Sequence, residues 1–523
     1  DRTFGIVVGE DVKDVDVAVY VEKQGKNYFL GVYIADVSYY VKENSTIDKE
    51  AQERGTSVYL VDRVLPMLPE TLSNGICSLN EGVDRLTMAC EMVIDGTTGL
   101  VRSYQIFPAI INSHHRMTYT AIRQMLVDKD QETISKYQDI WPMVQTMEKL
   151  CLVLKKKRLD RGAIDFDLAE QKVLLDDQKK PIAIIPRERS IAESIIEEFM
   201  LSANETVANH MAKAKWPFVY RVHDYPDLTR MESLGKLLAT FGVVLRAQEK
   251  MEPMVLQKAL AEMKGKPEEK LINTVALRSL KQAVYQTDNV GHFGLAAEFY
   301  THFTSPIRRY PDLIVHRLLR KWLQNHDLSA NEADELELKL ENIATHSSVK
   351  ERAAAEAERA TVELKEAEYM ADYIGQEFSG TISGVTSFGI FVTLDNGVDG
   401  LIHISSLTDD YYDFEEDKYA LVGFHLHKTY RLGDEIKVEV LQVNIPEHQV
   451  DLVLAGENPE MKQYIKAQLQ EKNSVLGSKS KNHGAYFSSL KSHAGMEKKH
   501  RGKSTRKNKE ARGRKKRERR KKY

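Results

Sequence analysis

Cysteine is scarce in this 523-residue chain, which contains only Cys77, Cys90 and Cys151. Three cysteines at these spacings exclude a disulfide framework and a four-cysteine zinc site, and they suit a reducing cytoplasm. No apolar run approaches the roughly 18 to 20 residues that a membrane span needs, so we expect no membrane partner. The chain also lacks a glycine-rich phosphate-binding loop and the Gly-x-Ser-x-Gly turn of serine hydrolases, which argues against two common enzyme classes.

An initiator methionine is absent too, and the chain opens inside a strand pattern, so we expect a fragment whose upstream part is missing. The net charge of −3 conceals a division along the chain. Residues 478–523 contain 19 Lys and Arg against 3 Glu, a net charge of +16, while the remainder has 55 basic and 74 acidic residues. We therefore expect an acidic body and a basic tail that behave as separate parts.

The order of apolar patterns predicts an α+β region. From about residue 1 to 110, short β-branched runs alternate with turn signals, whereas helical patterns dominate from about 111 to 372. One helix is expected after Ser190, because Ser190 and Glu193 form the pattern of a capping box. Another is expected to begin at Pro311, since proline suits a first helical position.

The chain length predicts two or three domains, and the patterns suggest where they divide. We place the first domain at residues 1–372, a mixed sheet with surrounding helices that ends in a long, charged and solvated helix. Residues 373–456 carry frequent glycines and about five alternating strands, which is typical of a small OB-fold barrel. Residues 457–523 are expected to form a linker and a basic low-complexity tail, and the region after about Gly477 should be disordered, because it has hardly any apolar clusters.

The stretch GEDVKDVDVAVYVEK places Asp14 and Asp16 in a run that otherwise favours a β-strand. Hard cations such as Mg²⁺ prefer oxygen ligands, usually one or two carboxylates together with phosphate oxygens of a substrate. Asp11, Asp14 and Asp16 could supply these ligands from one turn-and-strand segment. The alternative is a solvated loop that is merely acidic.

The stretch HFTSPIRRYPD, residues 302–312, places two arginines after Thr-Ser-Pro and before a helix. Arginine binds phosphate well, because its planar guanidinium group donates two parallel hydrogen bonds. A helix N-terminus also favours anions. The pattern indicates a phosphate site, with an ordinary pair of surface arginines as the alternative.

Aromatic and imidazole side chains could stack on unpaired bases in both domains. Three candidates lie in the first domain among basic or polar neighbours, and three could form an RNA-binding sheet surface on the small barrel: Tyr59, Tyr119, Phe166, Phe388, Phe391 and His403. Core packing is the alternative for each of them. The basic tail would add contacts to phosphates without reading sequence, with a solubilising role as its alternative.

Several longer motifs point in one direction: LGVYIADVSYYV, RGTSVYLVDRVLPMLPETLSNGICSLN, RGAIDFD, IIEEFMLSANE, GHFGLA, YTHFTSPIRRYPDLIVHR and AEAERATVELKEAEYM. With them the chain resembles the ribonuclease II and ribonuclease R family of processive 3′→5′ exoribonucleases, and within it the bacterial ribonuclease R branch. The resemblance implies a catalytic RNB domain over residues 1–372, an S1-type barrel and a basic tail. It also implies hydrolysis of single-stranded RNA to nucleoside 5′-monophosphates in RNA turnover and quality control, with Mg²⁺ as the cofactor.

The same resemblance implies which residues bind the metal. The family's loop resembles Asp-Gly-x-Asp-x-(Lys/Arg)-Asp-x-Asp-Asp, whose first, third, fourth and fifth aspartates surround the Mg²⁺. Asp14 and Asp16 match the third and fourth aspartates, and Asp11 matches the second, which is not a ligand. Val8 and Val17 stand at the first and fifth positions, where valine offers no lone pair to a cation.

Further roles follow from the resemblance. Arg308 would contact the scissile phosphate, and Glu358 would support the site. Tyr59 and Phe166 would clamp the last bases, while Tyr119 would contact a sugar near the 3′ end and favour RNA through its 2′-hydroxyl. Water would attack the terminal phosphodiester in line, with Mg²⁺ assisting.

Two functions remain open, and they differ only at Val8 and Val17. One is an active exoribonuclease, and the other is a catalytically impaired RNA-binding protein with the same fold. The long motifs of the first domain argue against a third, a translation-associated S1 protein of other ancestry. Expected partners are single-stranded RNA, structured RNA with a 3′ overhang, and the ribosome or RNA-turnover machinery through the tail; we expect a cytoplasmic monomer.

Overall fold

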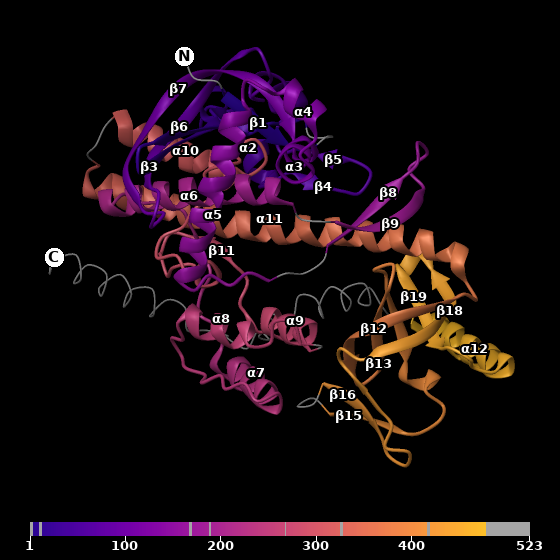
Figure 1. Ribbon diagram of the computed structural model, residues 1–523. Coiled ribbons are helices and arrows are strands. Elements are labelled where there is room, and N and C mark those ends of the chain that lie inside the picture. The colour runs from indigo at the N-terminus through magenta and orange to yellow at the C-terminus, as the bar shows by residue number, and fades with distance from the viewer. Residues whose placement is uncertain are drawn as a thin grey trace.

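The computed structural model describes residues 4–9, 13–166, 170–187, 190–266, 268–324, 328–415 and 419–476. Within these residues, two closed β-barrels lie near opposite ends of one long helix (Figure 1). No helix in this part of the chain combines the length and apolar character of a membrane-crossing segment.

The first barrel is built from the β-branched runs near the start of the chain. Its strands are β1 (Phe4–Val8), β2 (Val17–Gln24), β3 (Asn27–Ala35), β6 (Asp84–Asp95) and β7 (Val101–Thr118). They follow the order β1–β2–β3–β6–β7 and close, because β1 pairs in parallel with β7. The predicted mixed sheet is confirmed; its closure into a barrel, which no sequence pattern indicated, removes the free sheet edges.

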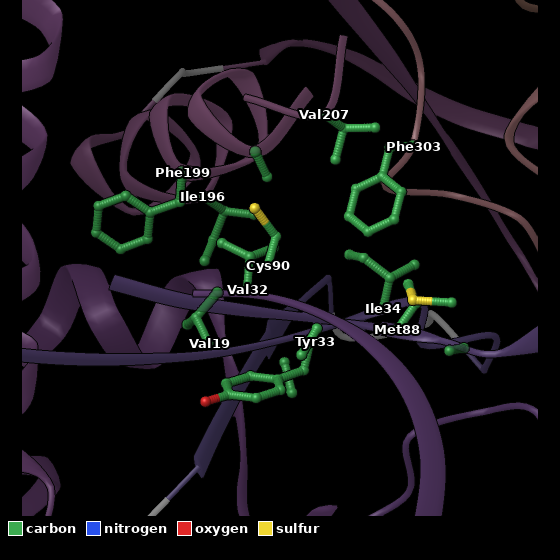
Figure 2. Close-up of a cluster of buried hydrophobic side chains, with 14 of the residues drawn as sticks. Val19, Val32, Tyr33, Ile34, Met88, Cys90, Ile196, Phe199, Val207 and Phe303 are labelled. Atoms are coloured by element: carbon green, nitrogen blue, oxygen red, sulfur yellow. The ribbon is translucent and has the colours of Figure 1, made fainter. Parts of the chain in front are cut away.

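Helices cover one side of this barrel and make a common core with it. Helix α6 (Ile191–Ala214) packs on β3, and α5 (Trp141–Asp160) packs on β2 and on α6. Figure 2 shows Ile196 and Phe199 of α6 above Val32 of β3, with Phe303 above Ile34 and Val207 beyond Phe303. Since helices cover one face of β3 and the barrel interior covers the other, nearly every residue of this strand is buried.

Capping boxes start the two longest helices that the structure describes. At α6, Ser190 and Glu193 satisfy each other's backbone N–H groups, which confirms the predicted box. Ser329 and Glu332 do the same for α11 (Ala330–Met370), a 41-residue helix. At a rise of 1.5 Å per residue, α11 is about 60 Å long.

Helix α11 differs from the expected solvated helix, because parts of it are buried. Leu340, Ile343 and Ala344 pack into the core of the first barrel, and Met370 packs into the core of the second. Charged residues remain on its exposed flank, which explains why its sequence reads as a solvated helix. The helix therefore joins the two cores directly.

The second barrel has the five strands that the sequence predicted. They are β12 (Glu377–Thr386), β13 (Gly389–Leu394), β14 (Asp399–His403), β18 (Glu435–Asn444) and β19 (Gln449–Leu454), closed in the order β12–β13–β14–β19–β18. Between β14 and β18 the chain forms an additional three-stranded sheet of β15 (Tyr412–Glu415), β16 (Ala420–Gly423) and β17 (Thr429–Arg431), which was not predicted.

The first part of the expected linker and tail, residues 457–476, is helical over most of its length. Helix α12 (Pro459–Leu476) occupies it, and its Ile465 and Leu469 are buried against Leu441 and Val453 of the second barrel. This helix was not predicted, because only a few apolar residues dock it. The basic tail, 477–523, lies outside the described residues.

Smaller elements surround the barrels. A separate helical cluster consists of α7 (Leu228–Thr240), α8 (Pro253–Ala261) and α9 (Glu269–Ser279), and a hairpin of β8 (Glu170–Leu175) and β9 (Pro181–Arg187) lies beside α11 (Figure 1). Other helices and strands are α1 (Val37–Tyr40), α2 (Thr46–Arg54), β4 (Val58–Tyr59), β5 (Val64–Leu65), α3 (Tyr119–Arg123), α4 (Gln131–Lys136), β10 (Tyr220–Val222), β11 (Val284–Gln286) and α10 (Tyr310–Gln324).

Ile34 and Ile110 allow a matched test of the first core. Ile34 is 0% exposed, whereas Ile110 on β7 of the same barrel is 68% exposed. We expect Ile34→Ala to lower the free energy of unfolding by about 2–5 kcal/mol, because it leaves a cavity. Ile110→Ala should cost about 1 kcal/mol or less, from strand propensity. Denaturant unfolding followed by tryptophan fluorescence measures both, and equal losses would contradict the burial of Ile34.

Candidate active site

Asp14 and Asp16 lie in a short segment just before β2 that belongs to no helix or strand. The N–H of the intervening Val15 donates to Ser78 Oγ at 3.0 Å, and the N–H of Ala35 donates to the carbonyl of Asp16 at 2.9 Å. These bonds hold the backbone on both sides. Asp14 and Asp16 line one cavity, so both carboxylates lie on the same side of the segment.

The buried carboxylate of Asp16 meets the turn that precedes α10. Its Oδ1 accepts a hydrogen bond from the backbone N–H of Ile307 at 3.0 Å, and its Oδ2 lies 4.0 Å from Arg308 Nε. The side chain of Arg308 is 40% exposed, so it can contact a ligand beside Asp16. The two motifs singled out in the sequence therefore lie side by side.

The adjacent arginines of this turn have different roles, which corrects their interpretation as one phosphate site. Arg309 points inward, where its Nη2 lies 2.7 Å from Oδ1 of the fully buried Asp312. The same oxygen accepts the N–H of Ser305 at 2.8 Å. Asp312 thus fixes the turn that carries Arg308, and only Arg308 remains for a ligand.

Tyr59 links Asp14 to the long helix α11. Its hydroxyl donates to Asp14 Oδ2 at 3.1 Å, and its backbone N–H donates to Glu358 Oε1 at 2.8 Å. Glu358 therefore reaches the site by holding the short strand β4, on which Tyr59 lies. Burial and the neighbouring Asp14 raise the pKa of Tyr59, so the phenol stays protonated and remains a donor.

Burial dominates the electrostatics of Asp16. It raises the pKa of this carboxyl from 3.8 to about 7, although Arg308 and the N–H of Ile307 favour the charged form. The nearby carboxylates of Asp14 and Asp312 act in the same direction as burial. A raised pKa means that too little positive charge surrounds the carboxylate to stabilise its ionised form, and a bound cation would supply that charge.

These groups open into one cavity of about 1180 Å³. Tyr119 lines it as well, and burial raises the pKa of this phenol. Val17 also lines the cavity, so the position expected to be acidic has an apolar side chain. Charged and polar side chains that the sequence analysis had not assigned to the site complete the wall: Arg123, Gln171, Lys172, Arg187, Ser190, Glu193 and Ser305.

Other predicted residues lie elsewhere or outside the described part. Phe166 is partly buried against the cluster of α7, α8 and α9 and is not among the residues that line the cavity. The backbone of Val8 pairs with Thr118, but its side chain is not described. Asp11, considered as a further ligand, lies outside the described residues.

The three candidates on the second barrel gather on one face of β13 and β14. Gly389 pairs with His403, and Phe391 two residues further on shares its side of the sheet. The rings of Phe388 and Phe391 meet edge to face with centroids 5.8 Å apart. Phe391 is only 9% exposed, which leaves Phe388 and His403 more accessible.

The side chains present fit one divalent cation better than two. No group of three or more His, Cys, Asp or Glu residues suited to a metal occurs in the part of the chain that the structure describes. Asp14 and Asp16 provide two carboxylates on one side, and a substrate phosphate and water could complete the shell of one hard cation. A second cation would need further carboxylates, and Val17 provides none.

The sequence reasoning missed the basic residues of the cavity wall. Lys172 and Arg187 lie on a hairpin whose strands, EQKVLL and PIAIIPR, contain one basic residue each and therefore show no basic pattern. Arg123 lies on the short helix α3, directly after the motif that contains Tyr119. Their closeness to Asp14 and Asp16 depends on chain folding over more than 100 residues, for which no local pattern exists.

Comparison with known proteins now identifies the family. Residues 1–325 match the RNB domain, and residues 372–452 match the S1 RNA binding domain. The chain is 47% identical over 445 residues to ribonuclease R 1 of Lactococcus lactis subsp. lactis (strain IL1403), which covers 85% of this chain and 54% of that protein. The chain belongs to the ribonuclease R family.

Two further relatives support the assignment of this chain to the ribonuclease R family. Ribonuclease R of Thermotoga maritima is 45% identical over 464 residues, covering 88% of this chain and 65% of that protein. The structure of Mycoplasma genitalium RNase R in complex with ribose methylated single-stranded RNA superposes with a TM-score of 0.80 at 33% identity, covering 87% and 71% of the two chains. The chain thus spans between about half and two thirds of the length of these curated relatives.

The different roles of Arg308 and Arg309 can be tested by measuring the stability of variants. We expect Arg309→Ala to lower the free energy of unfolding by about 3–5 kcal/mol, because it leaves the buried charge of Asp312 without its cationic partner. Arg308→Ala removes a partly exposed charge from the same turn and should cost about 1 kcal/mol or less. Urea unfolding compares the two, and similar costs would show that Arg309 is not a structural residue.

Asp16 should make stability depend on pH when divalent cations are removed. Between pH 3.8 and about pH 7, Asp16 keeps its proton in the folded state, whereas it has released this proton in the unfolded state. The free energy of unfolding should therefore fall as the pH rises from about 4 to 7. Asp16→Asn should lose this contribution, so the two proteins differ least near pH 4 and the variant is more stable at pH 8. Urea midpoints in EDTA that run parallel across this range would contradict the raised pKa.

Proposed function

We propose that this chain is a 3′→5′ exoribonuclease that hydrolyses single-stranded RNA processively to nucleoside 5′-monophosphates. The observation that carries the proposal is the meeting of Asp14, Asp16 and Arg308 at one cavity, in a chain of the ribonuclease R family. Carboxylates for a cation and an arginine for a phosphate are the chemistry that phosphodiester hydrolysis needs.

Each residue of the site has a role in this proposal. Arg308 binds the scissile phosphate through its guanidinium group, and Asp312 holds the turn in position. Tyr59 contacts the last nucleotide while its hydroxyl orients Asp14, and Glu358 is a positioning residue that acts through Tyr59. Tyr119 contacts a sugar near the 3′ end, and we keep Phe166 as a stacking residue only for a conformation in which it leaves the α7–α9 cluster.

Mg²⁺ held by Asp14, Asp16 and an RNA phosphate would activate the attacking water and stabilise the leaving oxygen. The raised pKa of Asp16 supports a cation here, because the charged carboxylate lacks a compensating positive charge. The protein's own share is to bury Asp16, to aim Arg308 at the phosphate, and to keep the Tyr59 hydroxyl protonated.

A second function has a specific observation in its favour. Val17 lines the cavity beside Asp14 and Asp16, where a fourth acidic ligand is expected. A catalytically impaired RNA-binding protein with the same fold therefore remains the alternative. In it Phe388, Phe391 and His403 on the S1 barrel would still bind RNA by stacking.

The proposal extends to partners and setting. We propose RNA turnover and quality control in the cytoplasm, with single-stranded RNA or structured RNA with a 3′ overhang as substrate. The domains would be a catalytic one at residues 1–372, an S1 barrel at 373–456 and a C-terminal region at 457–523. The basic tail would bind phosphates and contact the ribosome or RNA-turnover machinery, and the chain would act as a monomer.

A gel with 5′-labelled single-stranded RNA and Mg²⁺ separates the two functions. The exoribonuclease shortens the labelled RNA from its 3′ end, whereas the impaired protein retards it in a native gel without shortening it. Failure to bind RNA at all would overturn both. Addition of EDTA should stop shortening and leave retardation largely unchanged.

Restoring the missing carboxylates gives the sharper prediction. The chain as it stands should cleave slowly, and Val8→Asp together with Val17→Asp should raise turnover by orders of magnitude, because the site can then hold its metal charge. Each single restoration should do less, since ligands act as one site. Val8→Asn with Val17→Asn is the matched neutral control. Rapid Mg²⁺-dependent turnover by the unchanged chain would contradict this account.

A further inference from the structure

The hairpin of β8 and β9 joins three parts of the molecule, and its position suggests a use. Figure 1 shows it rising beside the C-terminal half of α11, close to β4 and β5 and to the second barrel. Helix α11 contacts both β8 and β9. No sequence motif drew attention to this hairpin.

Its two faces differ in chemistry. Val173 and Ile184 form one cross-strand pair; Ile184 belongs to the apolar core of the S1 barrel, and the partly buried Val173 packs against it. Lys172 and Ile185 form the next pair, which faces the other way. Lys172 and Arg187 are exposed. One face thus fastens the hairpin, and the other presents basic side chains.

Polar contacts fasten the turn of the hairpin as well. Lys365 Nζ of α11 donates to the carbonyl of Lys179 at 2.9 Å, and Lys180 Nζ lies 3.5 Å from Asp372 Oδ2. Lys179 Nζ also lies 3.5 Å from Asp62 Oδ2, in the segment between β4 and β5. The hairpin is therefore held at its turn and along one face.

Near its base, the hairpin connects the S1 barrel to the catalytic cavity. Gln171 lines the cavity and also packs on the β13–β14 turn, where a Cβ added to Gly397 would overlap its side chain. Lys172 and Arg187 line the same cavity as Asp14 and Asp16. The positive charge of Arg187 is close enough to Tyr119 to offset part of the rise in that residue's pKa.

We propose that the exposed face of the β8–β9 hairpin guides the phosphate backbone of RNA between the S1 barrel and the catalytic cavity, with Lys172 and Arg187 as the phosphate ligands. The proposal rests on the proposed function, because it takes RNA to be the ligand of the cavity. Basic side chains bind phosphates by releasing counterions and without reading bases. A fastened hairpin offers them at fixed positions, so little order is lost when RNA binds.

Neutral phosphates provide the test. A 16-nucleotide RNA carries one methylphosphonate linkage, moved stepwise from the 3′ end, and fluorescence anisotropy in EDTA gives its affinity. Lys172→Gln with Arg187→Gln should weaken binding of unmodified RNA about tenfold and lower the salt slope by about 1.4, since two single-strand phosphate contacts are lost. For the unchanged chain, a methylphosphonate at one or two positions a few nucleotides from the 3′ end should lower the affinity several-fold. For the double variant, a methylphosphonate at the same positions should not lower the affinity further.

Lys179→Gln with Lys180→Gln is the matched control, because it removes the same charge from the turn of the same hairpin. Both side chains are exposed, and their ion pairs at the surface contribute little. The bond from Lys365 to the backbone carbonyl of Lys179 and the apolar face still hold the hairpin, so this control should fold and bind like the unchanged chain. Equal losses in both variants, or a methylphosphonate penalty that persists in Lys172→Gln/Arg187→Gln, would overturn the guide while RNA binding still supports the proposed function. Absence of RNA binding by the unchanged chain would overturn the proposed function itself. A thermal midpoint for each variant confirms that it is folded.

Discussion

One hydrogen bond joins the two halves of the candidate site, from the backbone N–H of Ile307 to the carboxylate of Asp16. It connects residues 291 positions apart in the sequence, one before a strand of the first barrel and one before helix α10. Its two partners are placed by two separate elements, Asp16 by the closed barrel that β2 belongs to and Ile307 by the turn whose Ser305 N–H is bound to Asp312, so both elements must be in position. The placement of Arg308, of Tyr59 and of the cavity wall depends on the same two conditions.

The site therefore has an electrostatic asymmetry. Asp16 is buried beside Asp14 and Asp312, so its charge is unfavourable until a cation or a proton compensates it. Arg308 only partly compensates, since its nearest nitrogen lies 4.0 Å away and its side chain is partly exposed. In such surroundings Val17 has two opposing effects. It removes a charge that would destabilise the folded chain without metal, and it removes a ligand that would hold the metal.

Features that depend on residues close together in the sequence were predicted correctly. The capping box of Ser190 and Glu193, the five strands of the second barrel and the long helix ending near residue 370 all follow from propensity and periodicity. The carboxylate pair and the arginine turn were also recognisable as chemistry, and the structure brings them together. The family resemblance supplied the expected positions of Val8 and Val17, which composition alone would not reveal.

Features that depend on contacts between residues far apart in the sequence were not predicted. Nothing in the adjacent pair Arg308 and Arg309 says which one points inward, because the choice is made by Asp312 and the packing around it. Closure of the first barrel depends on the parallel pairing of β1 with β7, about 100 residues apart, and docking of α12 depends on two apolar residues. Phe166 illustrates the same limit, since its partner cluster of α7, α8 and α9 lies further along the chain.

Helix α11 has a consequence for the length of RNA strand that the protein covers. One stretch of it holds Tyr59 through Glu358, and its last turn enters the core of the S1 barrel. The helix is continuous between these two points and rises about 1.5 Å per residue. The spacing between the RNA surface of the barrel and the carboxylates is consequently set by the number of helical residues between them. The protected footprint on a bound strand should then have a constant length, whatever the sequence of the strand.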